Sequence, residues 1–220
     1  MTTYAVMQAR IADELTRTDL TSQIQKAILS AIKHYERTRF YFNASVTDTF
    51  STVASQEYYG SAANSKIPNL VVIDGLTVTN SSIKSALANV PFTSVEEMQN
   101  SAITGLPTAF CYYAQQIRLY PIPDAVYTVT GSWLYRLTAL SADGDTNAWT
   151  TDAEELIRNR AECDLMWRLI DNPARAQYFR LAELEALKAL EFETAQRHAV
   201  PRLGVDAGLM AAPGYNINTG

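Results

Sequence analysis

The stretch that decides the fold runs from residue 20 to residue 50 and reads LTSQIQKAILSAIKHYERTRFYFNASVTDTF. Its first half repeats apolar residues at three- and four-residue spacing, which predicts an amphipathic helix. From residue 39 onward, apolar and polar residues alternate, which predicts a half-buried antiparallel strand. The alternating apolar residues are Phe40, Phe42, Ala44, Val46 and Phe50. The change of period indicates that a helical segment is followed directly by a β-rich one.

A second helix is predicted upstream, over residues 3–16, with Thr3 as its N-cap. Its apolar face consists of Tyr4, Met7, Ile11 and Leu15. Asp19 is the predicted cap of the helix that follows. Two helices joined by so short a connection form an antiparallel hairpin, so residues 1–38 are expected to contribute a helical hairpin to a bundle.

Residues 39–150 are expected to form an inserted antiparallel β domain, a small sandwich of six to eight strands. Strands are predicted within residues 40–50, 57–59, 69–73, 76–79, 83–87, 109–114, 117–120 and 127–135. Asp74-Gly75 is either a tight turn or a bulge, because both use this dipeptide. Ser94 and Glu97 match a capping box and predict a short helix over 95–100.

Residues 151–198 return to helical periodicity and are expected to complete the bundle. Thr151 and Glu154 match a second capping box. The predicted core face of the helix that they begin is Leu156, Ile157, Ala161, Leu165 and Leu169. Pro173 is placed at the first position of a last helix, which runs to about His198. Its predicted apolar residues are Tyr178, Leu181, Leu184, Leu187, Leu190 and Phe192.

Residues 199–220 differ from the rest of the chain. They are rich in glycine and proline, which disfavours an independent fold, yet they keep too many apolar residues for a solvated linker. We interpret this segment as an extended tail that orders only against a partner. Its candidate contact residues are Pro201, Leu203, Val205, Leu209, Met210, Tyr215 and Ile217.

The charge balance argues against a protein that grips nucleic acid. Eighteen lysines and arginines against 23 acidic residues give a net charge of −5, and no segment is strongly basic. Such a surface suits DNA that slides past without specific binding. Cys111 and Cys163 are expected to be buried and reduced in a cytoplasmic product. We expect neither a secretory leader nor a membrane span.

Catalytic motifs are scarce. The sequence has no nucleophile elbow, no glycine-rich phosphate loop and no zinc-ligand spacing, and both histidines are expected to be structural. The carboxylate pairs Glu96/Glu97, Glu154/Glu155 and Asp143/Asp145 leave a hydrolase as one hypothesis. Neighbouring glutamates on a helix diverge by about 100°, so first-turn interactions with the helix dipole explain them better. We predict neither an enzyme nor a cofactor.

One loop has the spacing of a calcium site. Asp143, Asp145 and Asn147 follow one another at two-residue steps, and Glu154 falls at the twelfth position, as in an EF-hand loop. Ala148 stands where such a loop needs glycine. The alternative is a turn-rich loop whose short side chains bind their own backbone.

Aromatic residues are frequent in the later strands: Tyr112, Tyr113, Tyr120, Tyr127, Trp133 and Tyr135. On one exposed face they would form a platform for sugars or bases, and the chain would then be a ligand- or carbohydrate-binding β module. The alternative is that they belong to the core or to a subunit interface.

An ordered set of short motifs carries a family resemblance. It comprises Gly105-Leu-Pro107, Tyr112-Tyr113, Ile117-Arg-Leu-Tyr-Pro-Ile-Pro-Asp124, Tyr127, Tyr135, Leu140-Ser-Ala-Asp143, Asn147-Ala-Trp149 and Asp152-Ala-Glu-Glu-Leu-Ile157. With the helix pair before it, this set resembles the head-to-tail adaptor proteins of short-tailed bacteriophages, also called tail accessory or head-completion proteins. The likeness covers about residues 3–198.

The resemblance implies an assembly role. Such adaptors bind the portal as a ring, commonly twelve-fold, after DNA packaging. The ring extends the DNA channel and offers a platform for later tail or nozzle proteins at the neck of the virion. In the family the helical part makes the ring, the β part projects from it, and a C-terminal segment reaches the portal. Some relatives are linked to cell-wall degradation, for which no residue pair stands out here.

Overall fold

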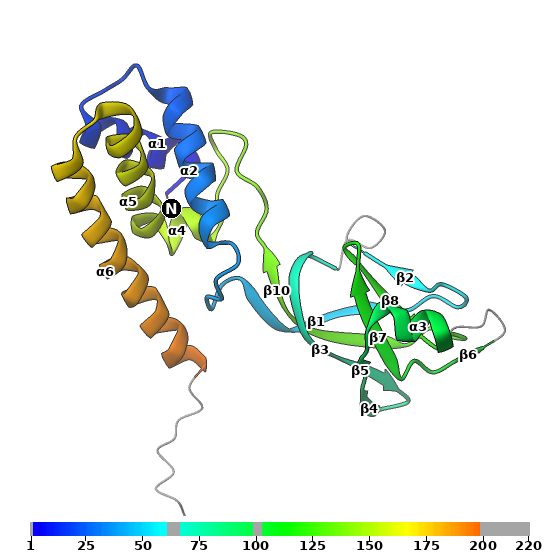
Figure 1. Ribbon diagram of the computed structural model, residues 1–220. Helices are drawn as coiled ribbons and strands as arrows, with labels where there is room; N and C mark the ends of the chain where they lie inside the picture. Colours follow the sequence, from blue (N-terminus) through cyan, green and yellow to red (C-terminus); the bar gives the residue numbers. More distant parts are fainter. Residues whose placement is uncertain (1, 61–66, 99–102, 199–220) are drawn as a thin grey trace, which may run out of the picture.

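The computed structural model describes residues 2–60, 67–98 and 103–198, and it arranges them as a helical part beside a β part (Figure 1). Helices α1 (Tyr4–Leu15) and α2 (Thr21–Tyr35) come first, and ten strands with the short helix α3 (Phe92–Met98) follow within the described residues. The described chain ends with α4 (Ala148–Thr151), α5 (Glu154–Leu165), the π-helical segment η1 (Met166–Ile170) and α6 (Pro173–His198). The fold is therefore mixed α+β, as predicted.

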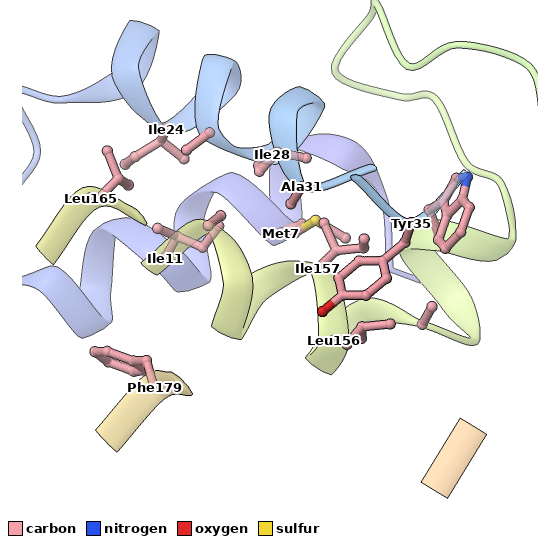
Figure 2. Close-up of a cluster of buried hydrophobic side chains, with 14 of the residues drawn as sticks. Met7, Ile11, Ile24, Ile28, Ala31, Tyr35, Leu156, Ile157, Leu165 and Phe179 are labelled. Carbon is pink, nitrogen blue, oxygen red and sulfur yellow. The ribbon is translucent and has the colours of Figure 1, made fainter. Parts of the chain in front are cut away.

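The helical part has its own hydrophobic cluster, to which α1, α2, α5 and α6 all contribute. Figure 2 shows side chains of α1 and α2 converging on Ile157 and Leu165 of α5, with Phe179 of α6 at the margin. The predicted face of α1 is confirmed, because all four of its apolar residues are buried. Thr3 caps this helix, since its hydroxyl accepts a hydrogen bond from the Val6 amide at 3.3 Å.

The prediction that Asp19 caps α2 is wrong. The residue before α2 is Leu20, which makes no side-chain cap bond, and Asp19 pairs with Arg17 at 2.7 Å instead. Leu20 itself is buried in the helical cluster.

The strand predicted from residue 40 starts later, because Phe40 and Phe42 belong to the helical cluster. Their rings lie edge-on to Trp149, with centroids 5.9 and 5.0 Å away. Asn43 bends the chain at this point: its side chain accepts from the Phe40 amide and donates to the Thr38 carbonyl, both at 2.8 Å. Residues 40–42 therefore belong to a turn although their pattern alternates like a strand. Strand β1 begins after this turn and spans Ala44–Ser51.

The β part consists of two four-stranded sheets and one two-stranded pair. The first sheet has the order β1, β10 (Thr128–Arg136), β3 (Asn69–Asn80), β4 (Ile83–Ala86), and all its pairs are antiparallel. The second has the order β2 (Tyr58–Tyr59), β8 (Gln116–Tyr120), β7 (Ala109–Tyr113), β5 (Ala88–Asn89), and its β5–β7 pair is parallel. Strands β6 (Thr104–Gly105) and β9 (Ile122–Pro123) also pair in parallel. The two large sheets share one hydrophobic cluster.

The register of β3 settles the alternatives for Asp74-Gly75. Gly75 pairs with Ser132 and Ile73 pairs with Trp133, so Asp74 is the extra residue of a bulge in one continuous strand. The expected return of residues 83–87 against Val78 is confirmed, because Ser85 pairs with Val78.

Two local predictions in the β part need correction. The turn between β7 and β8 lies at Ala114-Gln115, whose φ angles are 48° and 61°, as a two-residue hairpin turn requires. It is thus one residue earlier than Gln115-Gln116, where the predicted strands 109–114 and 117–120 would place the turn. Helix α3 also begins before Ser94, so Ser94 cannot be its cap.

Glycine is required at one position of β10. A Cβ atom on Gly131 would lie 1.8 Å from the Trp133 ring, so any other residue would displace the indole. Trp133 is fully buried and its ring nitrogen donates to Asp48 at 3.0 Å. Gly131 therefore makes room for the largest side chain of the β core.

The capping box at the return to the helical part is also displaced from its predicted place. Asn147 and Thr150 form a reciprocal box at the start of α4, whereas Ala153 precedes α5 without a cap bond. The α5 core face is confirmed except for Leu169, which is exposed because the helix widens to the π form at η1. Pro173 begins α6 as predicted.

Polar contacts join the helical and β parts. Arg136 at the end of β10 pairs with Glu36 after α2 at 3.0 Å, and Arg39 pairs with Asp74 at 2.6 Å. Beside them lies a groove of about 550 Å³ between α2 and the β10–α4 connection, to which Leu29 and Trp149 contribute.

Candidate assembly surfaces

The outer face of α6 carries large exposed apolar side chains. Tyr178, Leu181 and Phe192 are 67%, 58% and 65% exposed, and their spacing places them within about 60° of one another around the helix. Leu184, another apolar residue named for this helix from the sequence, is also exposed. An apolar stripe left open on a long helix is typical of a protein interface.

The buried face of α6 lies on the opposite side and has a different composition. It consists of Ala176, Phe179, Glu183, Leu190 and Thr194, so of the predicted apolar residues only Leu190 and the partly buried Leu187 pack against the cluster. A helix that is apolar on two faces gives no single period, and the sequence alone cannot say which face is inside.

Glu183 is a buried carboxylate that organises this inner face. It accepts from Arg180 at 2.7 Å and from Arg160 at 3.2 Å, and it also accepts from the Tyr35 hydroxyl of α2. Burial, followed by the hydrogen bond to Glu183, raises the pKa of Tyr35 above its usual range. Because all these partners hold the carboxylate, Glu183 joins α2, α5 and α6 rather than forming an open site.

A groove of about 620 Å³ runs between α5 and α6, next to the apolar stripe. Ala182, Ala186 and Ala189 contribute to it from α6, and small side chains allow a neighbouring helix to approach closely. Glu155 and Glu185 also line the groove; both are exposed, and neither pairs with a basic residue within the described chain. The side of α6 that borders this groove is therefore both exposed and acidic.

The outer face of α2 is basic. Its exposed residues are Lys26, Leu29, Ser30 and Lys33. They follow one another at three-, four- and seven-residue spacing, so they share one side of the helix. Neither lysine forms an ion pair with a described residue. These residues lie away from the buried stripe of α2, which runs from Ile24 to Tyr35.

A further exposed apolar side chain, that of Trp167, lies on η1. It borders a hollow of about 460 Å³ that Cys163, Ala174 and Arg180 also line. Cys163 is thus only half-buried, unlike the fully buried Cys111, and both are free thiols.

The calcium-loop residues are occupied by the protein's own groups. Asp145 accepts from the backbone amides of Ser141 and Ala142, both at 2.7 Å, and these bonds, the one from Ala142 foremost, lower the pKa of Asp145. Asn147 caps α4 by accepting from the Trp149 amide at 2.9 Å. This arrangement is the turn-rich alternative, in which side chains satisfy local backbone.

Glu154 does not take part in that turn but contacts the N-terminal helix. Its carboxylate pairs with Arg10 of α1 at 2.6 Å, while Asp143 contributes its backbone carbonyl to the Ala5 amide at 3.0 Å. In the described ranges, no three His, Cys, Asp or Glu side chains gather as metal ligands. Glu154 through its carboxylate, and Asp143 and Asp145 through their backbone carbonyls, therefore hold the N-terminal helix in place, whereas Asn147 caps α4.

The aromatic residues of the predicted stacking platform do not share one exposed row. Trp133 is fully buried, and Tyr112 and Tyr135 are half-buried with their hydroxyls donating to backbone carbonyls. Tyr113 is exposed, but its ring stacks on Phe92 of α3, with centroids 4.7 Å apart. Trp133, Tyr112, Tyr127 and Tyr135 pack in the β core, so these aromatic residues do not form the platform that would favour a carbohydrate-binding module.

The predicted partner-binding residues of the tail, Pro201 to Ile217, lie outside the described residues. Within the described part, no helix has the length and apolar character that crossing a membrane requires.

A chain with open apolar helix faces on an α+β scaffold belongs to the class of proteins that assemble with other chains. A comparison with protein-family models identifies the family: residues 2–205 match the model of the SU10 adaptor protein. Because this match spans most of the chain, the protein belongs to that family, and it is a phage head–tail adaptor. No curated protein matched the sequence.

Membership in this family assigns the general function of the protein. The protein is a structural component of a phage virion that joins other virion components. The resemblance noted from the motifs of residues 105–157 is thereby confirmed.

Proposed function

We propose that the protein binds the portal as a ring after DNA packaging, extends the DNA channel at the virion neck, and presents a platform for tail or nozzle proteins. The observation that carries this proposal is the open apolar face of α6, because in an adaptor such a face is available for a neighbouring chain. A twelve-fold ring is the copy number expected from the family.

We propose different roles for the helical and β parts, because in Figure 1 the β part extends to one side of the helical part. We assign ring formation to residues 1–38 and 151–198, and the platform to residues 39–150. Residues 199–220 reach the portal. The net charge of −5 is compatible with DNA passing through the channel, since an acidic wall does not retain phosphates.

The test is to mix the purified protein with DNA-filled phage heads that lack the adaptor and to image the particles. A ring of the protein at the portal vertex supports the proposal. Binding elsewhere on the head, or no binding at saturating protein, contradicts it.

A second test addresses the tail. A chain ending at residue 198 retains the cores described above, so its circular dichroism and unfolding midpoint should match those of the full chain. It should nevertheless fail to attach to the heads, because repeated tail contacts supply the avidity of the ring. Normal attachment of the truncated chain would exclude a portal-binding role for residues 199–220.

The free protein is expected to be monomeric at micromolar concentration, because docking on the portal brings the copies into register. Analytical ultracentrifugation measures this directly, and a closed ring in free solution would contradict it.

A further inference from the structure

We propose that the basic outer face of α2 in one copy docks against the apolar and acidic outer face of α6 in the next copy, a contact that rests on the ring proposed above. The partner is thus a second copy of this chain, and the two surfaces differ. Three features of the helical part support this pairing: charge, exposed apolar area and the placement of the two helices.

The charges of the two faces are complementary. Lys26 and Lys33 project from α2 without a carboxylate partner, and Glu155 and Glu185 border the α5–α6 groove without a basic partner, all among the described residues. Two basic residues lie nearby: Lys188 on the outer side of α6, three residues after Glu185, and Arg158 in the groove, where it pairs with Glu14 at 2.6 Å. They reduce the acidity of this edge without reversing it. Opposite charges on facing surfaces select the register and exclude wrong partners.

The apolar features also match. Leu181 and Phe192 protrude from α6, while Leu29 on α2 is exposed beside the groove that reaches Trp149. Burying such side chains removes apolar area from water at about 25 cal/mol per Å². The lysines and glutamates then lie around an apolar centre, which is the usual arrangement of a protein interface.

The two faces point away from each other. Helix α5 packs against both α2 and α6, and in Figure 1 it lies between them, so the outer faces are on opposite sides of the helical part. A ring needs such different, opposed surfaces, because identical surfaces would close a dimer. An α6–α6 contact would also bring the acidic edges of two copies together.

The expected contact is small. Helix α2 has 15 residues and a length of about 22 Å, so one such contact is below the area of a stable complex. It is therefore weak between two free copies and effective only when repeated around a ring, in agreement with a monomeric free protein.

Cross-linking in purified virions tests the pairing. A phage gene that encodes both Leu29→Cys and Leu181→Cys is used to produce virions, which are treated with a short bismaleimide, denatured and separated by size. A ladder of multiples of this chain is expected. The unsubstituted chain, with Cys111 and Cys163 only, and each single variant should give monomers.

Imaging of the same virions separates the two proposals. A ring without a ladder overturns the α2–α6 contact and leaves the ring in place. Cross-linked dimers from Leu181→Cys alone show that α6 meets its own copy, and a product with another virion protein shows a different occupant; both overturn the contact. Absence of any ring overturns the ring and the contact together.

Charge reversal provides an independent measurement. Lys26→Glu with Lys33→Glu, or Glu155→Lys with Glu185→Lys, should each lower the amount of adaptor per virion by at least about tenfold. The fourfold variant should recover most of it, because every contact again joins opposite charges. Lys84→Glu, on the exposed strand β4, is the matched control and should have no effect. Failure of the fourfold variant to recover would overturn the pairing.

Discussion

Replacing Glu162 of α5 with glutamine is expected to stabilise the protein at neutral pH and to remove part of its pH dependence. Glu162 is fully buried, and its two carboxyl oxygens have no hydrogen-bond partner among the described residues. Burial, followed by the charge of Glu14 on α1, raises the pKa of Glu162 from 4.5 to about 9, against the opposing effects of Arg158 and Arg175. At pH 7 the folded protein therefore holds a neutral carboxyl group.

The magnitude follows from the difference in proton binding. The unfolded chain loses the Glu162 proton above pH 4.5, whereas the folded chain keeps it to about pH 9. Stability therefore falls by about 1.4 kcal/mol per pH unit in this window. Glutamine is neutral in both states, so the variant should gain about 3 kcal/mol at pH 7. This value is an upper limit, because local opening of the helices hydrates the carboxyl group.

The assay is chemical unfolding at several values between pH 5 and pH 8, followed by far-ultraviolet circular dichroism. The free energy of unfolding of the native chain should fall relative to that of Glu162→Gln as the pH rises. Glu191→Gln, exposed on α6, is the matched control and should run parallel to the native chain. A constant difference between the native chain and Glu162→Gln at every pH would refute the reasoning.

Three further substitutions test other parts of the structure, each by the free energy of unfolding. Phe40→Ala should cost about 3–5 kcal/mol, because it leaves a cavity in the helical cluster; a cost below about 1 kcal/mol would contradict the burial of Phe40 in that cluster. Gly131→Ala should destabilise the chain by about 1–3 kcal/mol through overpacking against Trp133, and a neutral result would contradict the close approach. Asn147→Ala should cost about 1 kcal/mol through the lost cap of α4, and an unchanged stability would show that the box contributes nothing.

The sequence was sufficient to predict secondary structure wherever a single helical or strand periodicity dominated a segment. The stripe of α1, the β3–β4 return and Pro173 at the start of α6 were all predictable, because each depends on local patterning or backbone chemistry. The bulge at Asp74 remained ambiguous until the partner strand was known. A bulge is defined by register across a pair, which a single strand does not contain.

The sequence failed where tertiary contacts overrode local pattern. Phe40 and Phe42 alternate like a strand, but the side chain of Asn43 turns the chain and directs both rings to Trp149. On α6, apolar residues occur on two faces of the helix, and the sequence did not show that Tyr178 and Leu181 are exposed. Protein interfaces use the same apolar residue types as cores, so composition alone does not separate the two faces.

Buried charge was the other feature that the sequence concealed. Glutamates normally lie at the surface, and nothing in their spacing distinguishes Glu162 or Glu183 from the exposed Glu185 and Glu191. Both buried residues face the core only because α5 and α6 present those positions to α1 and α2. Their identification therefore needed the packing of all four helices.

The most direct test of the account is the structure of the virion neck at a resolution that shows helices. We predict a closed ring of this protein directly below the portal, in which α2 of each copy contacts α6 of the next. Finding the protein elsewhere in the virion, or a ring whose neighbours touch only through their β parts, would contradict it.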